Sequence, residues 1–482
     1  MGHRYDAAGS APRFAADRTE RHFVPASAHA AGRRRGTLRD VLVVVHRWAG
    51  LLTAAFLVVT GLSGAVISWD HELDEWLNPH LVDARAGGAP RDALQLAREL
   101  EQRHPRAEVA YVPLAVEPGH SFAFWVEPRV DPSTRQLHAL DFNQVFVDPA
   151  SGEELGRREW GDVWPVTREN LVSFLYKLHY SLHVPEIAGT DRWGVWLLGV
   201  VALVWTVDCF GGLLLTLPRR GASGAGFWRR WKPAWKVRTR AGAYRFNFDL
   251  HRALSLWTWG LLFVIAFTAF SLNLYREVFF PAMSLVSDVT PGPFELRTPR
   301  PPHDPIPARL DFREALQRAD AEARARGWSE PAGGIFHSRE YGLYGVEFFR
   351  PEDGHGAGGV GHRRLYVDSQ DGRIVGAREP WTGTAADLFV QAQFPLHSGR
   401  ILGLPGRILV SAMGVVVAVL AITGVWIWWK KRRARRFHDA HAAARAGPVR
   451  SSAGSDAAGD RRDDIDDIDD TGDRSAARHT LP

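Results

Sequence analysis

Four hydrophobic blocks stand out in the pattern of polar and apolar positions along the chain. They are Trp48–Trp69, Trp193–Leu217, Ala253–Tyr275 and Ile408–Trp429, and Asp208 is the only charged residue within them. The shortest blocks have 22 residues. Because a helix rises about 1.5 Å per residue, 22 residues span about 33 Å, enough to cross a hydrocarbon core of about 30 Å. The pattern predicts a membrane protein with four transmembrane helices.

Arginine and lysine cluster on short segments beside these blocks, at residues 33–39, 219–245 and 430–436. The positive-inside rule assigns such flanks to the cytoplasm. We therefore expect both chain ends in the cytoplasm and the two long connections, 70–192 and 276–407, on the outer side. Tryptophans at the ends of the blocks, such as Trp48, Trp69 and Trp193, are typical of the membrane interface.

Each outer connection combines helical and strand patterns. Apolar residues recur at three-to-four spacing in Asp92–Gln102 and Phe312–Ala325, which predicts a helix in each connection. Alternating segments predict strands at Ser121–Val126 and Asn143–Val147 in the first connection, and at Gly342–Phe349 and Arg364–Asp368 in the second. Each connection is therefore expected to form an α+β domain.

The two halves of the chain resemble each other. Val147–Glu159 aligns with Val367–Glu379 at a constant offset of 220, with six identical positions, although part of this match is a turn pattern, Asp-x-x-x-Gly. Histidines extend the similarity, because His46-Arg47 and His251-Arg252 open the first and third spans, and Leu178-His179 and Leu396-His397 precede the second and fourth. Since each unit holds two spans, we expect two parallel repeats related by an axis along the membrane normal.

The predicted boundaries follow from these patterns. They are 1–37 (disordered cytoplasmic N-terminus), 38–69 (first span), 70–165 (first outer domain), 166–192 (helix with Leu178-His179 and its connection), 193–217 (second span), 218–248 (basic cytoplasmic loop), 249–275 (third span), 276–395 (second outer domain), 396–430 (fourth span with a preceding histidine loop) and 431–482 (disordered cytoplasmic tail).

The repeat places equivalent histidines at equal depth, His46 with His251 at the inner mouth and His179 with His397 at the outer mouth. Two neutral imidazoles facing each other across a bundle suit the axial positions of a haem iron. The single cysteine, Cys209, excludes covalent CxxCH attachment and four-cysteine clusters, but two haem b groups need no cysteine. Each histidine alone could equally be a hydrogen-bonded interfacial residue, and two ligands at each mouth are too few for a zinc site.

Several neighbouring residues have open roles. Arg47 and Arg252 at the inner face and Arg400 outside are expected to pair with haem propionates. His183 lies one helical turn after His179 and is an alternative ligand. Asp208 is either a group that takes part in proton or quinone chemistry, or a hydrogen-bond acceptor for a neighbouring helix or an indole.

These motifs together resemble the PepSY-associated transmembrane family of bacterial inner-membrane proteins over residues 38–435. The resemblance rests on His46–Leu51, the Asp148/Gly152 and Asp368/Gly372 turns, Leu178-His179, Trp205–Phe210, Phe248–Arg252, Pro395–Arg400 and Thr423-Gly424. It implies periplasmic PepSY-like domains and location in the inner membrane. Some members of the family are di-haem reductases of ferric siderophores, which implies haem-ligand roles for His46, His251, His179 and His397.

The leading hypothesis is electron transfer through two haems, from a quinol or a cytoplasmic reductase to a periplasmic ferric chelate or siderophore. The alternative is a non-haem, membrane-anchored module that binds or regulates an envelope protein. A permease is less favoured, because we expect four unbroken spans and alternating access commonly uses broken helices. No nucleic-acid motif is present. The sequence does not predict an oligomeric state.

Overall fold

The computed structural model describes residues 37–219, 226–354 and 356–445. The chain divides into two units between Ile427 and Trp428. Most of the two chain ends for which we predicted disorder lies outside the described residues.

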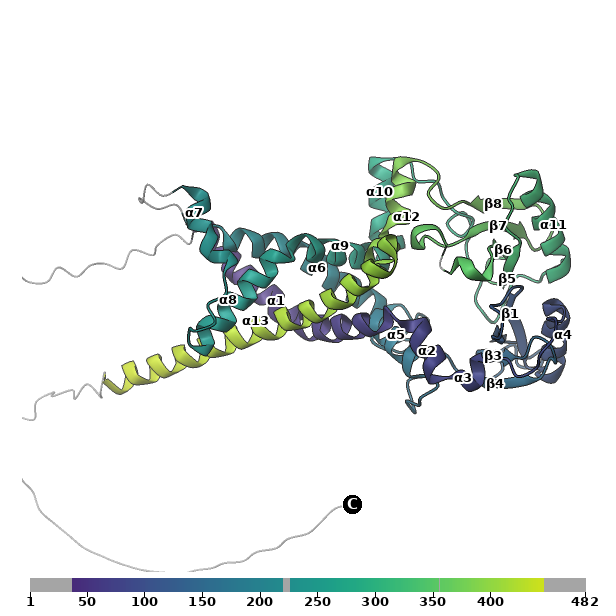
Figure 1. The fold of residues 1–482 in the computed structure, drawn as a ribbon, viewed down its shortest axis with the longest axis horizontal. Helices are drawn as coiled ribbons and strands as arrows, with labels where there is room; N and C mark the ends of the chain where they lie inside the picture. Colours follow the sequence, from purple (N-terminus) through teal and green to yellow (C-terminus); the bar gives the residue numbers. More distant parts are fainter. Residues whose placement is uncertain (1–36, 220–225, 355, 446–482) are drawn as a thin grey trace, which may run out of the picture. The chain divides into compact units, whose positions relative to one another are not determined.

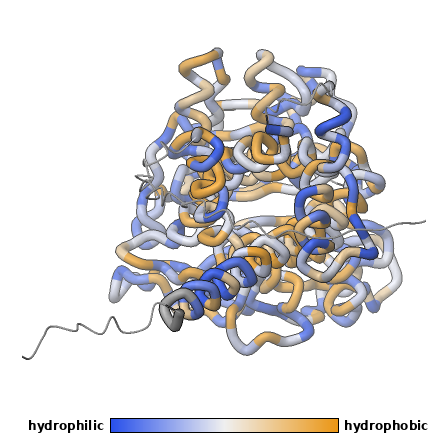
Figure 2. Tube along the Cα trace, turned by 90° about the vertical axis from the view of Figure 1, so that its left-hand side faces the viewer, coloured by the Kyte–Doolittle hydropathy of each residue, from blue (hydrophilic) through white to orange (hydrophobic). Residues whose placement is uncertain are grey.

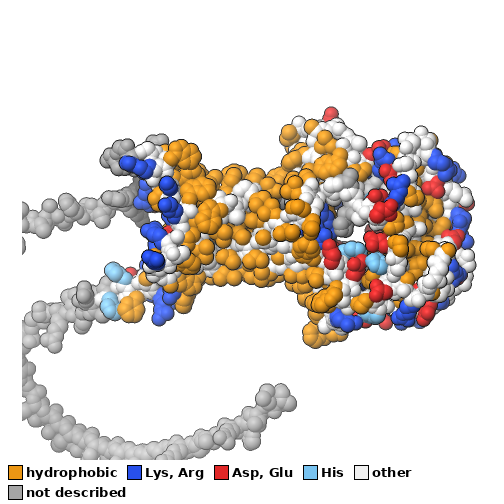
Figure 3. Space-filling model, viewed as in Figure 1, with side chains coloured by type: hydrophobic (Ala, Val, Ile, Leu, Met, Phe, Trp, Pro, Cys, Tyr) orange, Lys and Arg blue, Asp and Glu red, His pale blue; other side chains and the backbone are white. Residues whose placement is uncertain are grey.

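Three helices are long and apolar enough to cross a membrane, and a bent pair of helices makes a fourth span if it is counted as one. The three are α1 (Leu38–Ile67), α6 (Trp193–Thr216) and the apolar part of α13 (Gly403–Arg445), and the pair is α8 (Ala243–Trp257) with α9 (Trp259–Asn273). Figure 1 shows these helices as a bundle, and Figure 3 shows hydrophobic side chains along its outer surface, with Lys and Arg gathered near α7 and α8. The structure therefore supports a membrane protein with three to four spans.

The third span is broken, which corrects our expectation of unbroken helices. Between α8 and α9 the axis bends by 72°. At Thr258 the backbone leaves the helical region, with φ −110° and ψ 8°, and the side-chain hydroxyl donates to the carbonyl of Leu254 at 2.8 Å. The spans therefore no longer disfavour a permease, since one of them is broken.

Helix α13 continues past the hydrophobic block to Arg445, so the prediction of disorder from residue 431 is wrong for residues 431–445. This stretch is rich in Arg and Ala, which are strong helix formers. Figure 2 shows the hydrophilic character of these last turns.

Apolar side chains from four helices meet in the middle of the bundle. Leu57 from α1, Cys209 from α6, Leu262 from α9 and Met413 from α13 belong to one cluster. Helices α1 and α13 approach closely nearby, because a Cβ atom at Gly61 would lie 2.7 Å from the carbonyl oxygen of Gly414. Small residues allow such backbone contact between membrane helices.

The remaining helices are shorter. They are α2 (Asp70–Leu77), α3 (Pro79–Val82), α4 (Ala93–Arg103), α5 (Leu171–Ser181), α7 (Phe227–Trp231), α10 (Phe280–Val286), α11 (Phe312–Ala325), α12 (Ala385–Ser398), and the single turns η1 (Lys232–Trp235), η2 (Tyr275–Phe279), η3 (Pro351–Asp353), η4 (Ala357–Gly359) and η5 (Arg400–Leu402). Since α12 includes His397, this histidine lies on a helix and not on the loop that we predicted.

One eight-stranded antiparallel sheet joins the two connections. Its strands are β1 (Ala107–Pro113), β2 (Phe122–Pro128), β3 (Gln144–Val147), β4 (Glu154–Arg158), β5 (Ala332–Ser338), β6 (Leu343–Phe348), β7 (Arg363–Asp368) and β8 (Ile374–Arg378). Their order is β4-β3-β2-β1-β5-β6-β7-β8, so two four-stranded meanders meet at the β1–β5 pair. Helices α4 and α11 pack on this sheet and form one hydrophobic core with it (Figure 1).

The repeated Asp-x-x-x-Gly motif builds the same turn in both halves. The Asp148 carboxylate accepts hydrogen bonds from the backbone amides of Ala150 and Ser151, and Asp368 does the same for Gln370 and Asp371. Gly152 and Gly372 follow at φ +77° and +73°, a left-handed conformation that favours glycine. Burial raises the pKa of Asp148, but amide hydrogen bonds outweigh it and hold this pKa well below its usual range.

A buried histidine makes the sheet sensitive to acid. His337 on β5 is 8% exposed, and burial, with a contribution from Arg339, lowers its pKa to about 4. The unfolded chain therefore binds a proton near pH 6.5 that the folded sheet does not bind until about pH 4. We expect the free energy of unfolding to fall by up to about 1.4 kcal/mol per pH unit from pH 6.5 to pH 4, and not above pH 6.5. Urea unfolding of the detergent-solubilised protein tests this, and His337→Gln should lose this part of the pH dependence.

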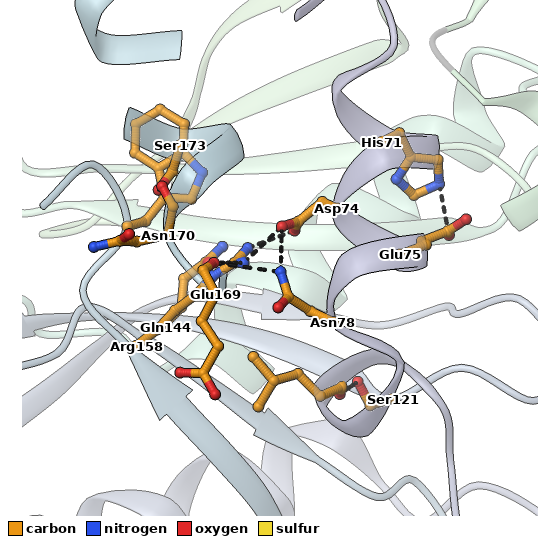
Figure 4. Close-up of polar contacts among 12 residues, drawn as sticks. His71, Asp74, Glu75, Asn78, Ser121, Gln144, Arg158, Glu169, Asn170 and Ser173 are labelled. Carbon is orange, nitrogen blue, oxygen red and sulfur yellow. Dashed lines mark hydrogen bonds and ion pairs between the residues drawn. The ribbon is translucent and has the colours of Figure 1, made fainter. Parts of the chain in front are cut away.

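Arg158 connects the sheet to the helices that lead into the bundle (Figure 4). From β4, its guanidinium donates to both oxygens of Asp74 on α2, at 2.8 and 2.6 Å, and to the carbonyl of Glu169, just before α5, at 2.8 Å. Its Nε donates to Gln144 on β3, and its side chain is 6% exposed. The same side chain therefore fixes α2 and the start of α5 on the sheet.

Replacing Arg158 with methionine should destabilise this connection strongly. The change keeps most of the volume but leaves Asp74 partly buried without its cation, which costs about 3–5 kcal/mol. Arg157→Met is the matched control, because the Arg157 side chain is 46% exposed. Urea midpoints should fall for Arg158→Met alone and recover substantially in the double variant Arg158→Met/Asp74→Leu. Equal midpoints for the two single variants would contradict this role.

Candidate functional site: two histidine pairs

The structure brings the four predicted histidines together as two pairs. The ring centres of His46 and His251 are 6.4 Å apart, and those of His179 and His397 are 6.1 Å apart. The first pair lies at the end of the bundle near α7, here named the basic end, and the second lies at the end that leads into the sheet, here named the sheet end. Each pair takes one histidine from each half of the chain.

His46 on α1 is held by a carboxylate. Its Nδ1–H donates to Asp208 on α6, with both carboxylate oxygens at 2.9 Å. The Asp208 carboxylate therefore accepts a hydrogen bond from a neighbouring helix and not from an indole, and its role in proton or quinone chemistry stays a prediction.

His251 on α8 is held by a hydroxyl. The Oγ1 of Thr423 on α13 lies 3.0 Å from Nδ1 of His251 and donates its own proton to the carbonyl of Val419 at 2.7 Å. Since this hydroxyl proton is already used, Thr423 accepts from the Nδ1–H of His251.

The sheet-end pair is held in the same way. The Nδ1–H of His179 on α5 donates to the carbonyl of Thr60 on α1 at 2.9 Å. His397 on α12 lies 3.0 Å from Oγ1 of Thr268 on α9, whose hydroxyl donates to the carbonyl of Val264. His397 therefore also carries its proton on Nδ1.

All four imidazoles thus share one tautomer, with the proton on Nδ1 and the lone pair on Nε2. No hydrogen bond to any of the four Nε2 atoms occurs within the described part of the chain. A partner that holds the Nδ1–H of a histidine is the usual support for a metal-binding imidazole, because it fixes the ring and leaves Nε2 free.

The spacing of each pair fits one metal ion between two rings. A bond from a metal ion to an imidazole nitrogen is about 2 Å long, and the nitrogen lies about 1 Å from the ring centre, so two rings on opposite sides of one ion have centres about 6 Å apart. Both observed separations agree with this value. Within the described residues, no group of three or more His, Cys, Asp or Glu side chains could hold a metal ion.

Glycines on the facing helices make room for three of the rings. A Cβ atom at Gly64 would lie 2.7 Å from Cε1 of His179, closer than real Cβ contacts. The corresponding distances are 3.2 Å from Gly424 to His251 and 3.4 Å from Gly212 to His46. The position of the His179 ring therefore depends on the absence of a side chain at Gly64, the contact at Gly424 would be tight, and a Cβ atom at Gly212 would make an ordinary contact.

His183, the alternative ligand, points elsewhere. Its ring stacks on Phe174 with centres 4.5 Å apart, and its Nε2–H donates to the carbonyl of Phe174 at 2.8 Å. The backbone after α5 turns back through Leu182 and His183 at φ +55° and +53°, so one helical turn no longer separates His179 from His183 on a common face. The geometry favours His179.

The three predicted arginines differ in their surroundings. Arg47 packs over the ring of Trp48, and its buried Nε has no hydrogen-bond partner among the described residues. The Nε of Arg252 also has no partner among the described residues, but its guanidinium donates to the carboxylate of Asp249 at 3.0 Å and to a backbone carbonyl. Arg400 lies 3.2 Å from Asp70. Arg47 therefore has the most capacity left for an anion.

Sequence reasoning found the histidines but missed the residues that hold them. Asp208 stood out only as a charge inside an apolar block. Thr423-Gly424 was noted as a motif without a role, and Thr60, Gly64 and Thr268 were not noted. A polar residue or a glycine within a span was the available sign of a residue that holds a histidine or makes room for it. Which histidine it contacts depends on how the helices pack.

One comparison with known proteins identifies a family. The family model described as the PepSY-associated TM region matches residues 43–431, which is most of the chain. No match was found among the curated proteins.

Proposed function

The chain belongs to the PepSY-associated TM family, and we propose that it carries electrons across the bacterial inner membrane through two b-type haems. The donor is a quinol or a cytoplasmic reductase at the basic end, and the acceptor is a periplasmic ferric chelate or siderophore at the sheet end. The observation that supports this most is the common tautomer of four histidines in two pairs, each pair with the spacing of two axial ligands.

Each haem iron, when bound, would alternate between the ferric and ferrous states and so accept and pass on one electron. His46 and His251 would hold one haem, and His179 and His397 the other. Because two imidazoles would bind each iron, the sites would favour electron transfer over oxygen chemistry. A quinol that gives two electrons releases two protons and reduces two ferric ions in turn.

The two sites lie far enough apart to cross much of the bilayer. Along α1, Thr60, which holds His179, follows His46 by fourteen residues, or about 21 Å at about 1.5 Å per residue. The apolar cluster around Cys209 and Leu262 belongs to the helices between them and excludes water. The protein therefore needs to supply only position and insulation between the haems.

Charged residues near the pairs support haem binding. At the basic end, the unpartnered Nε of Arg47 suits a propionate, and Arg252 is oriented by Asp249, which is fully buried. At the sheet end, Arg400 is positioned beside Asp70.

We propose that the basic end faces the cytoplasm and the sheet faces the periplasm, since the short basic flanks follow the positive-inside rule. The two halves are then parallel repeats. The mirrored strand order and the matching Asp148 and Asp368 turns support this arrangement. The first outer segment, 70–165, has 18 Asp or Glu against 9 Arg and no Lys, which favours a cationic or metal-bearing acceptor.

Proteoliposomes test the proposed activity. They would enclose a membrane-impermeant reductant and be exposed to a ferric hydroxamate chelate with ferrozine outside. We expect ferrous ferrozine to form at least tenfold faster than in protein-free liposomes, and this excess to vanish in His397→Ala. Equal rates for the wild type and His397→Ala would contradict ferric reduction by this route, and a colourless wild-type protein would favour the non-haem module.

A further inference from the structure

We propose that Asp208 sets the direction of electron flow, by giving the basic-end haem a lower midpoint potential than the sheet-end haem. This inference rests on the proposed function, because it assigns a positioning residue to one of its two sites.

Among the described residues, His46 is the only one of the four histidines whose Nδ1–H donates to a carboxylate, that of Asp208. Both carboxylate oxygens lie 2.9 Å from Nδ1 of His46, and the Asp208 side chain is 13% exposed. Within the described residues, His46 is the only hydrogen-bond partner of this carboxylate. Placing a charged residue within an apolar span costs free energy, so the hydrogen bond to His46 indicates what the Asp208 carboxylate does there.

The other three histidines are held by neutral acceptors. Thr423 and Thr268 offer hydroxyl oxygens to His251 and His397. Thr60 offers a backbone carbonyl to His179, and the hydroxyl oxygen of Ser63 lies 3.2 Å from the same Nδ1 atom. Among the described residues, the sheet-end pair therefore has only neutral partners, whereas the basic-end pair has a neutral partner and a carboxylate.

A carboxylate partner changes the ligand more than a neutral one does. Hydrogen bonds to a charged acceptor are about twice as strong as neutral ones, and a carboxylate on Nδ1–H raises the basicity of the metal-binding nitrogen. A more basic ligand stabilises the ferric state over the ferrous state, and the nearby negative charge acts in the same direction within a low dielectric. Both effects lower the midpoint potential at the basic end.

The difference in potential makes transfer toward the sheet end favourable. The site that His46 and His251 would hold would take electrons from the donor, and the site that His179 and His397 would hold would pass them on, so that each electron from the donor would reduce one ferric ion of the chelate.

Redox titration of single-haem variants tests the order of the potentials. His397→Ala should retain only the basic-end haem and His251→Ala only the sheet-end haem. We expect the haem in His397→Ala to have the lower midpoint potential. The difference should be at least about 59 mV, which for one electron corresponds to a tenfold change in the ratio of reduced to oxidised haem. An equal or higher potential in His397→Ala would overturn the inference, although both variants would still contain haem as the proposed function requires.

Asp208→Asn tests the cause. Asparagine keeps an oxygen that accepts from Nδ1–H but removes the charge. The midpoint potential of the basic-end haem should therefore rise by about 59 mV, and that of the sheet-end haem should stay unchanged. Thr423→Val, which removes the neutral partner of His251 at the same haem, is the control and should cause a smaller shift. An Asp208→Asn protein with both haems and an unchanged lower potential would overturn the inference.

Discussion

Replacing His397 with alanine is expected to remove one of two haems per chain, and replacing His179 is expected to remove the same one. The two rings lie 6.1 Å apart and share one proposed iron, so loss of either leaves a single axial ligand. The pyridine haemochrome assay should show about half of the wild-type haem in each variant, and again about half in the double variant. His46→Ala combined with His397→Ala should remove both haems.

His183→Ala is the matched control for this prediction. His183 lies four residues after His179 but stacks on Phe174 instead of facing His397. We expect the full haem content in this variant. Half the haem in His183→Ala together with full haem in His179→Ala would show that the ligand was assigned to the wrong histidine.

A methyl group at position 64 is expected to remove the same haem without touching a ligand. In Gly64→Ala, the new Cβ would lie 2.7 Å from Cε1 of His179, so the ring must leave its place beside Thr60. Alanine is a better helix former than glycine, so helix α1 should not be weakened by the change itself. The visible spectrum and haem content should therefore resemble those of His179→Ala.

Gly50→Ala provides the control on the same helix, because nothing lies within 4 Å of a Cβ atom at that position. This variant should keep both haems and the wild-type spectrum. Full haem in Gly64→Ala would mean that the His179 ring does not occupy the observed position in the loaded protein.

The sequence predicted those features that depend on local pattern. The four hydrophobic blocks correspond to α1, α6, the α8–α9 pair and α13, and Phe312–Ala325 is helix α11 as predicted. The predicted strands correspond to β2, β3, β6 and β7. The position of each histidine at the mouth of a span, together with the repeat, was enough to predict the two pairs.

Features that depend on distant contacts were not predicted. Strand β5 contains two adjacent glycines and reads poorly as a strand. A Cβ atom at Gly334 would collide with the hydroxyl oxygen of Tyr111 on β1, so a side chain there would displace the Tyr111 ring. The joining of both halves into one sheet follows from this β1–β5 contact. The break at Thr258 and the partner of Asp208 also depend on how helices pack, which periodicity does not report.

The measurement that tests the central claim most directly is a reduced-minus-oxidised visible spectrum of the purified protein, with haem counted by pyridine haemochrome. We predict two low-spin b-type haems per chain, both with bis-histidine spectra, because each histidine pair offers two Nε2 lone pairs to one iron. A colourless protein purified from haem-replete cells would contradict it.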